Sequence, residues 1–204
     1  MTIDVAHKTS GHQLKTSFTV LTICGSLREK SFNAALVRAL PELAPSHVRF
    51  VPAPSYQTIP FYNADIQDLQ GFPQSVMEFA EAIHSADGVI FVVPEYNWTI
   101  PGALKNAIEW ISRLPRQPFV SKPVALQSAT QGPLGGARMQ YHLRMCLMGL
   151  GAVIYGIPEV FVGLAQDKFD KETLRLTDDT TRRFISDQLK GFSQLMATQA
   201  GKSI

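Results

Sequence analysis

Residues 25–33, which read GSLREKSFN between an apolar run and a helix-like pattern, combine residue types that could bind a phosphate group. At the start of a helix, unpaired backbone N–H groups and the positive end of the dipole attract anions. Because the dipole contributes only about 0.3–1 kcal/mol, charge-assisted hydrogen bonds must provide most of the binding. The alternative is an ordinary helix start that Ser31 caps, with Arg28 on the surface. The candidate phosphate-binding residues are Ser26, Arg28, Ser31 and Asn33.

Two further segments could surround a flat molecule. Residues 94–102, PEYNWTIPG, place two aromatic residues and two prolines after the clearest apolar run, as a rigid platform for a planar, amphipathic ring. Residues 128–138, SATQGPLGGAR, contain three glycines and two hydroxyl residues, so that a ligand can approach the backbone closely. In the alternative interpretation, Tyr96 and Trp98 only cover the edge of a sheet and residues 128–138 form a plain turn.

The three segments lack the side chains of a protein-based reaction. No histidine stands beside a serine or cysteine in them, and no cluster of carboxylates accompanies Glu95. The five histidines and two cysteines of the chain show no metal-ligand spacing. We therefore expect no catalytic side chain and no metal, and infer that a bound cofactor performs the chemistry.

Composition excludes several classes of protein. The chain has 204 residues, of which 45% are hydrophobic, and a net charge of +2, so a single domain without a nucleic-acid partner is expected. No apolar run approaches the roughly 20 residues that a membrane span requires. Residues 1–17 are interpreted as a flexible arm rather than a signal peptide, because only seven apolar residues follow them. The predicted location is therefore the cytoplasm.

Short apolar runs alternate with amphipathic stretches along the rest of the chain. We predict strands at residues 18–24, 49–53, 88–93, 123–128 and 152–155. Helices are predicted after Ser31, around 76–83, from Pro101, and at 135–149 and 180–198, with a loop between the second strand and Gly71. Lys105 and Asn106, one turn beyond Pro101, are expected to face solvent or cap the helix. This alternation predicts a parallel α/β sandwich, in which ligands bind at the carboxyl ends of the strands.

Together the three segments resemble a known family. The motifs G-S-L-R-x-x-S-x-N, P-E-Y-N-x-[ST]-x-P-G-x-L-K-N-A-[IL]-[DE]-W and S-A-T-x-G-x-x-G-G-x-R occur here in order and at family spacing. They are similar to those of the NADPH-dependent FMN reductase family, and within it to bacterial quinone reductases that also reduce chromate. The resemblance extends from Phe18 to Asp170, and its middle motif is the most specific.

The resemblance implies a flavodoxin-like three-layer sandwich with a five-stranded parallel sheet in the order 2-1-3-4-5 and helices on both faces. Residues 18–204 would form one FMN-binding domain. NADPH or NADH would transfer hydride to bound FMN, and electrons would pass to quinones, with chromate, azo compounds and free flavin as further acceptors. The residues carried over as FMN ligands are Ser26, Arg28, Ser31 and Asn33 at the phosphate, and Pro94, Glu95, Tyr96, Asn97, Ser128 and Gly132 at the ring.

The resemblance also implies a homodimer or homotetramer. We expect Arg138, Tyr141 and Glu159 to form a polar network across a subunit contact, with unrelated surface residues as the alternative. For Arg113, near the end of a predicted helix, two interpretations stay open: it complements the helix dipole, or it positions an anionic acceptor at a neighbour's flavin.

Two departures and two rival functions accompany this interpretation. Trp98 stands where the family more often has a small residue or tyrosine, which could alter access to the flavin, and the segment before Phe18 is longer than the family needs. A flavodoxin-like electron carrier without turnover is the main alternative, although a pI near 8.6 is unlike the acidic carriers that dock to basic partners. A response regulator would need an acidic pair after the first strand, which is absent.

Overall fold

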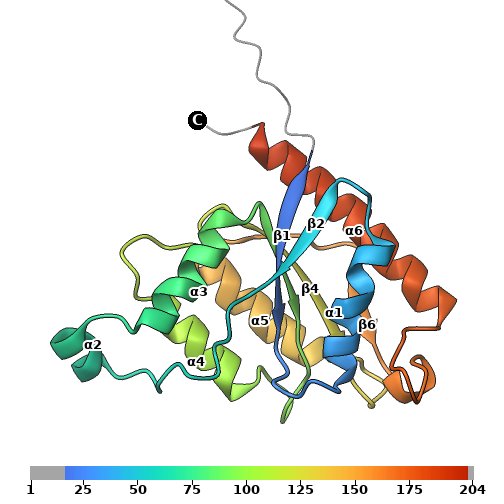
Figure 1. The fold of residues 1–204 in the computed structure, drawn as a ribbon, viewed down its shortest axis with the longest axis horizontal. Helices are drawn as coiled ribbons and strands as arrows, with labels where there is room; N and C mark the ends of the chain where they lie inside the picture. The colour runs from blue at the N-terminus through green and yellow to red at the C-terminus, as the bar shows by residue number, and fades with distance from the viewer. Residues whose placement is uncertain (1–16, 202–204) are drawn as a thin grey trace, which may run out of the picture.

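A parallel β-sheet forms the middle layer of the computed structural model, which describes residues 17–201 (Figure 1). Its strands are β1 (Phe18–Cys24), β2 (Val48–Pro52), β3 (Gly88–Val92), β4 (Pro123–Ala129), β5 (Val153–Ile154) and β6 (Val160–Val162). All paired strands are parallel, and the order β2-β1-β3-β4-β5 confirms the predicted topology. The predicted arm, residues 1–17, lies outside the described residues except for Ser17.

The outer position of the sheet beside β4 is shared by two short strands. β5 pairs with the first residues of β4, and β6 pairs with Gln127–Ala129 at its end. The prediction of one strand at 152–155 therefore missed Val160–Val162. Gly156 and Pro158 separate β5 from β6, and proline has no N–H with which to continue a ladder.

Helices cover both faces of the sheet. α1 (Phe32–Leu43) and α6 (Asp179–Ala200) pack on one face, where their apolar residues form a core with β1, β3 and β4. α3 (Gln74–Ser85), α4 (Gly102–Ile111) and α5 (Ala137–Gly149) enclose a second core on the other face. Every residue of β3 and β4 is buried, which explains why these strands read as nearly continuous apolar runs.

Two short helical elements were not predicted. α2 (Ala64–Gln70) lies within the expected loop and projects from the body of the molecule (Figure 1). It buries no residue, so no apolar periodicity could have revealed it. The other is a 3₁₀ turn at Ala165–Asp167.

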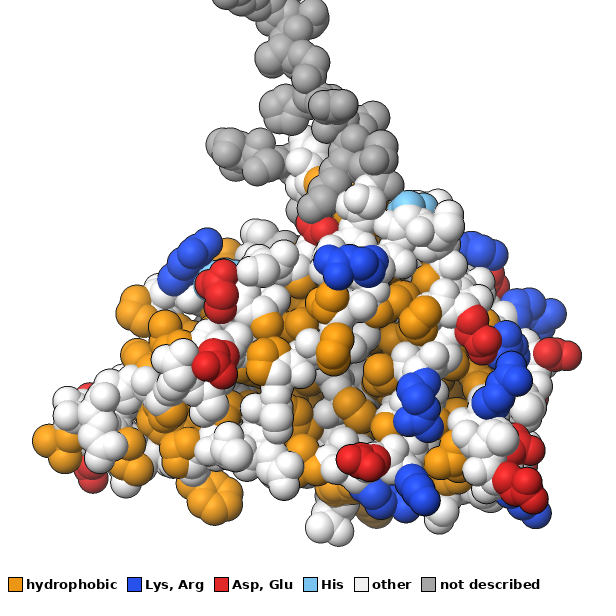
Figure 2. Space-filling model, viewed as in Figure 1, with side chains coloured by type: hydrophobic (Ala, Val, Ile, Leu, Met, Phe, Trp, Pro, Cys, Tyr) orange, Lys and Arg blue, Asp and Glu red, His pale blue; other side chains and the backbone are white. Residues whose placement is uncertain are grey.

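The surface differs from one end of the molecule to the other. Hydrophobic side chains are prominent near α2, and charged side chains of both signs are denser over the α1 and α6 side (Figure 2). Phe61 and Leu69 are among the most exposed apolar residues. In residues 17–201, no helix combines the length and apolar character that crossing a membrane requires.

Candidate functional site

The carboxyl ends of β1, β3 and β4 bring the three predicted segments together around two adjoining hollows. The first hollow, of about 190 Å³, is lined by seven of the predicted cofactor residues: Ser26, Arg28, Ser31, Asn33, Pro94, Glu95 and Tyr96. The second hollow, of about 340 Å³, contains two others, Asn97 and Gly132, and also Trp98 and Arg138. Glu95 and Thr130 line both hollows, which therefore form one continuous surface.

The start of α1 opens onto the first hollow. Ser31 caps this helix, and its Oγ accepts a hydrogen bond from the Ala34 N–H at 3.0 Å. Before it, the Arg28 N–H donates to Ser26 Oγ at 3.4 Å, and the Arg28 side chain is exposed. The first turn of α1 has no acidic residue. The positive end of the helix and a guanidinium are thus both available to an anion.

Asn33 joins the first segment to the third. Its Nδ2 donates to the Ala129 carbonyl at 2.9 Å, and the Ala129 N–H donates to Asn33 Oδ1 at 3.0 Å. The residue is only 3% exposed. Both polar atoms of the amide are therefore used within the protein, which gives Asn33 a positioning role at the rim of the first hollow.

Ser128 lies beneath the site and lines neither hollow. It is fully buried, donates to the Gly135 carbonyl and accepts a hydrogen bond from Gln140 Nε2 at 2.7 Å. A Cβ atom at Gly136 would come within 2.8 Å of Ser128 Oγ. Ser128 therefore supports the third segment from below. Thr130, which lines both hollows, was not predicted by name, although a hydroxyl residue between Ser128 and Gly132 was a usable signal.

The middle of the second segment forms a tight turn with a strained backbone. The Tyr96 N–H donates to the Thr99 carbonyl at 3.1 Å, and the Thr99 N–H donates back at 3.0 Å. Between them Asn97 and Trp98 have φ values of 47° and 70°, a left-handed conformation that bulky residues rarely adopt. Trp98 is 68% exposed, so it projects from the turn at the second hollow instead of covering the sheet.

A carboxylate and a guanidinium connect this segment to α5. The Glu95 side chain is 8% exposed; it accepts hydrogen bonds from Arg138 Nε at 2.7 Å and from the Met139 N–H at 3.2 Å, and also contacts Arg138 Nη2. The Arg138 guanidinium carbon lies 4.4 Å from the centroid of the Trp98 ring. From the sequence, Glu95 was predicted at the flavin ring and Arg138 at a subunit contact, because no local signal connects residues 43 positions apart.

Of the expected network, the pair of Tyr141 and Glu159 is in contact within one chain, and its extension with Arg138 across a subunit contact stays a prediction. Tyr141 donates to Glu159 Oε2 at 3.2 Å, but the cation paired with Glu159 is Arg144, at 3.2 Å. Arg138 binds Glu95 instead, because the first turn of α5 starts beside the end of β3.

Two predictions on α4 have different outcomes. Lys105 pairs with Glu109 at 2.6 Å on a partly exposed face. Asn106, however, is buried: its Oδ1 accepts from the Tyr62 N–H at 2.8 Å, and its Nδ2 donates to the Pro60 carbonyl at 2.9 Å. The expectation that Asn106 faces solvent or caps the helix is wrong, because the β2–α3 connection covers it.

Arg113 lies beyond the end of α4 and lines neither hollow. Its side chain is exposed, and the guanidinium carbon is 5.1 Å from the Tyr62 ring centroid. Within one chain it therefore contacts an aromatic ring rather than the site.

Two titratable groups at the end of β1 are suited to remain neutral. Tyr56 donates its hydroxyl to the Cys24 carbonyl at 2.7 Å. Burial raises the pKa of the Cys24 thiol and strongly raises the pKa of the Tyr56 phenol. Among residues 17–201 no group of three or more His, Cys, Asp and Glu residues could hold a metal ion.

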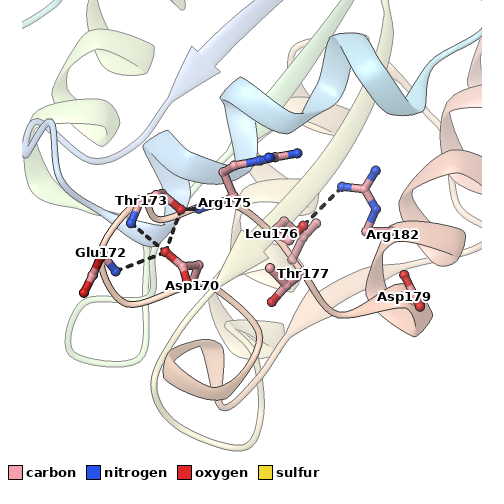
Figure 3. A pocket seen from close by; sticks show the side chains of 8 residues that line it. All are labelled: Asp170, Glu172, Thr173, Arg175, Leu176, Thr177, Asp179 and Arg182. Atoms are coloured by element: carbon pink, nitrogen blue, oxygen red, sulfur yellow. Dashed lines mark hydrogen bonds between the residues drawn. The ribbon is translucent and has the colours of Figure 1, made fainter.

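A larger hollow, of about 500 Å³, lies between the 170–177 loop and the start of α6 (Figure 3). Asp170 accepts hydrogen bonds from the Thr173 side chain and from the backbone of Thr173 and Glu172, which lower the pKa of its carboxyl group. Arg182 donates to the Leu176 carbonyl at 3.1 Å. These contacts stabilise the loop itself, and none of the predicted cofactor residues lines this hollow.

Comparison with known proteins identifies the family. The model of the NADPH-dependent FMN reductase family matches residues 18–167. The chain belongs to this family. It is 46% identical over 177 residues to the quinone reductase of Escherichia coli strain K12, covering 87% of this chain and 94% of the relative. An NAD(P)H-dependent FMN reductase of Pseudomonas aeruginosa is 44% identical over 171 residues, which cover 84% of this chain and 91% of the relative.

A solved structure in the same fold is FerB, a flavoenzyme NAD(P)H:(acceptor) oxidoreductase from Paracoccus denitrificans. It aligns with a TM-score of 0.79 at 29% identity and covers 89% of this chain and 98% of that one. The chain of 204 residues, as a member of the FMN reductase family, therefore has the flavodoxin-like fold that its three motifs imply.

The two hollows fit FMN, which carries a phosphate at one end and a flat ring at the other. The first hollow offers Arg28, two hydroxyl groups and the start of α1 to the phosphate. At the second hollow, a Cβ atom added to Gly132 would meet nothing within 4 Å, so the glycine leaves space beside the 94–98 segment. The residues present are compatible with the cofactor of the family.

Proposed function

We propose that this protein is an FMN-dependent NAD(P)H oxidoreductase that reduces quinones. The observation that carries the proposal is the convergence of three strand ends on two continuous hollows, one suited to a phosphate and the other to a flat ring. The similarity to a bacterial quinone reductase over most of both chains supports quinones as the acceptor. Bound FMN supplies two-electron redox chemistry between NADPH or NADH and the acceptor.

The protein's own residues bind and orient the cofactor. Ser26, Arg28 and Ser31 bind the phosphate at the start of α1, while Asn33 holds this segment against Ala129. Around the ring we assign Pro94, Glu95, Tyr96 and Asn97 on one side and Gly132 on the other, with Ser128 supporting the third segment from below.

Further parts of the proposal concern range and assembly. Chromate, azo compounds and free flavin are possible additional acceptors, because an acceptor needs only to reach the exposed ring. Residues 18–204 act as one FMN-binding domain in the cytoplasm. Copies associate as a dimer or tetramer through the surface of Arg138, Tyr141 and Glu159, and in that assembly Arg113 positions anionic acceptors at a neighbouring site. Sedimentation as a monomer at micromolar concentration would contradict the assembly.

Anaerobic mixing of the FMN-loaded protein with NADPH or NADH tests the central proposal. We expect either nucleotide alone to bleach the visible absorbance of the bound flavin, and a quinone then to restore it. Steady-state turnover with a panel of quinones measures the acceptor preference. If bleaching requires an added protein reductase, the chain is an electron carrier and the proposal is wrong.

A further inference from the structure

Trp98 occupies an unusual place at the rim of the second hollow. It exposes 68% of its surface and has a φ of 70°. A left-handed backbone costs free energy for a bulky side chain, and strained residues of this kind persist when surrounding contacts over-determine them. The contacts that hold Trp98 in this conformation therefore indicate the role of the residue.

Three elements hold the indole in one place. Paired backbone hydrogen bonds between Tyr96 and Thr99 close the turn. The guanidinium of Arg138, in the first turn of α5, lies against one face of the ring at 4.4 Å from its centroid. Glu95, at the end of β3, fixes the guanidinium through Nε at 2.7 Å and through Nη2.

A guanidinium suits this place because it can donate hydrogen bonds along its edge while its flat face stacks on an aromatic ring. Lysine, a point charge on a flexible stem, cannot do both at once. The Glu95 side chain is almost fully buried and also accepts a hydrogen bond from the Met139 N–H. The segment after β3 and the first turn of α5 therefore determine the position of Arg138. The position of Trp98 is determined in turn by Arg138.

We propose that Arg138 is a positioning residue that holds Trp98 as a fixed wall, so that Trp98 limits the size of the flat acceptor that can approach the flavin ring. Both residues line the second hollow. Because Trp98 and Arg138 narrow the second hollow, the opening favours quinones of one or two rings, and wider acceptors, including the three-ring free flavin, are poorer substrates. The inference deepens the proposed function and rests on it.

The first test measures acceptor discrimination in the FMN-loaded enzyme. The native protein should show a higher kcat/KM for 1,4-benzoquinone than for a three-ring anthraquinone sulfonate. Arg138→Leu and Trp98→Ala should each reduce this ratio about tenfold, the range expected for relief of a steric restriction in a pocket. Trp98→Tyr retains a flat ring and should keep most of the discrimination.

The second test observes Trp98 directly. The chain has two tryptophans, and Trp110 is fully buried, so acrylamide quenching of fluorescence in the holoenzyme reports on Trp98. Arg138→Leu should increase the quenching constant and lower the anisotropy. Arg138→Lys should resemble Arg138→Leu, because it keeps the charge without the stacked plane. Lys190→Leu removes an exposed cation paired with Asp187 on α6 and should match the native protein in both tests.

The possible outcomes separate this inference from the proposed function. Unchanged discrimination in Trp98→Ala, or native quenching in Arg138→Leu, would overturn the inference. If Arg138→Leu does not fold, Trp98→Ala, altered in an exposed turn, still decides the size limit. If NAD(P)H fails to bleach the flavin of the native protein, the proposed function fails, while the quenching of Trp98 still tests the role of Arg138.

Discussion

Around the first hollow, polar side chains bind backbone groups, whereas around the second hollow side chains from distant elements bind one another. Ser31 caps its own helix, and Asn33 pairs with the backbone of Ala129. At the second hollow, Glu95, Arg138 and Trp98 form a chain of side-chain contacts across β3, α5 and a strained turn. The first hollow, where the phosphate is proposed to bind, therefore depends on ordinary helix and strand geometry, while the second hollow depends on three particular side chains.

The largest effect should follow loss of the Asn33 contact. Asn33→Leu leaves the Ala129 N–H and carbonyl without their side-chain partner in a buried place, and each unsatisfied group costs about 1–3 kcal/mol. We expect the free energy of unfolding to fall by about 2–6 kcal/mol, measured by denaturant titration, together with weaker FMN binding. If Asn33→Leu has native stability and only its FMN affinity falls, Asn33 is a direct ligand of FMN. Its main role would then not be to bind the backbone of Ala129.

Arg28 should affect binding without affecting the fold. Its side chain is exposed, and loss of a charge-assisted contact to the phosphate costs about 1.5–3 kcal/mol. Arg28→Ala should therefore weaken FMN affinity by about ten- to a hundredfold, measured by titration of the apoprotein, with unchanged unfolding and little change in turnover at saturating FMN. Full flavin occupancy and native FMN affinity in the purified variant would show that Arg28 does not bind the phosphate.

The start of α6 is a reference for the start of α1. Asp178 caps α6 and Asp179 stands in its first turn, whereas α1 has a neutral cap and no acid there. Asp178→Ala and Ser31→Ala should each lower stability by about 0.5–2 kcal/mol at neutral pH. Only Ser31→Ala should also weaken FMN binding; equal FMN affinity in the two variants would argue against a phosphate at α1.

The cap of α6 also predicts a pH dependence. Hydrogen bonds from the Thr181 side chain and backbone lower the pKa of the Asp178 carboxyl group. Its contribution to stability is therefore complete above the pKa of the unfolded chain, about 3.9, and is lost as the pH falls through the lower folded value. The stability difference between native protein and Asp178→Ala should shrink over that acidic range, whereas the difference for Ser31→Ala should not.

The smallest effect concerns the strain at Trp98. At an ordinary position glycine is less stable than alanine by roughly 0.5–1 kcal/mol, but a left-handed backbone costs a side chain about 1–2 kcal/mol. Trp98→Gly should therefore be more stable than Trp98→Ala by about 0.5–1 kcal/mol, as differential scanning calorimetry can show. The reverse order would mean that the turn relaxes in the variants and that Trp98 is not held under strain.

Much of the fold was predictable because its strands are buried on both faces. β1, β3 and β4 read as apolar runs, and the amphipathic patterns of α1, α3 and α6 followed from their packing on the sheet. α2 buries nothing, and β6 has only three residues, so neither left a periodic signal. Asn106 could not be recognised as buried, because the segment that covers it lies more than 40 residues away.

The parallel α/β class, the family and the three segments at the strand ends could be recognised from the sequence, because each depends on residue types at short spacing. Which polar groups are engaged within the protein became clear only from the fold. Asn33 and Ser128 carry the right chemistry for a ligand, but their neighbours in space already use it. The contact of Glu95 with Arg138, and of Arg138 with Trp98, depends on where β3 ends beside α5, and a distance across the fold leaves no trace in the local pattern of a single sequence.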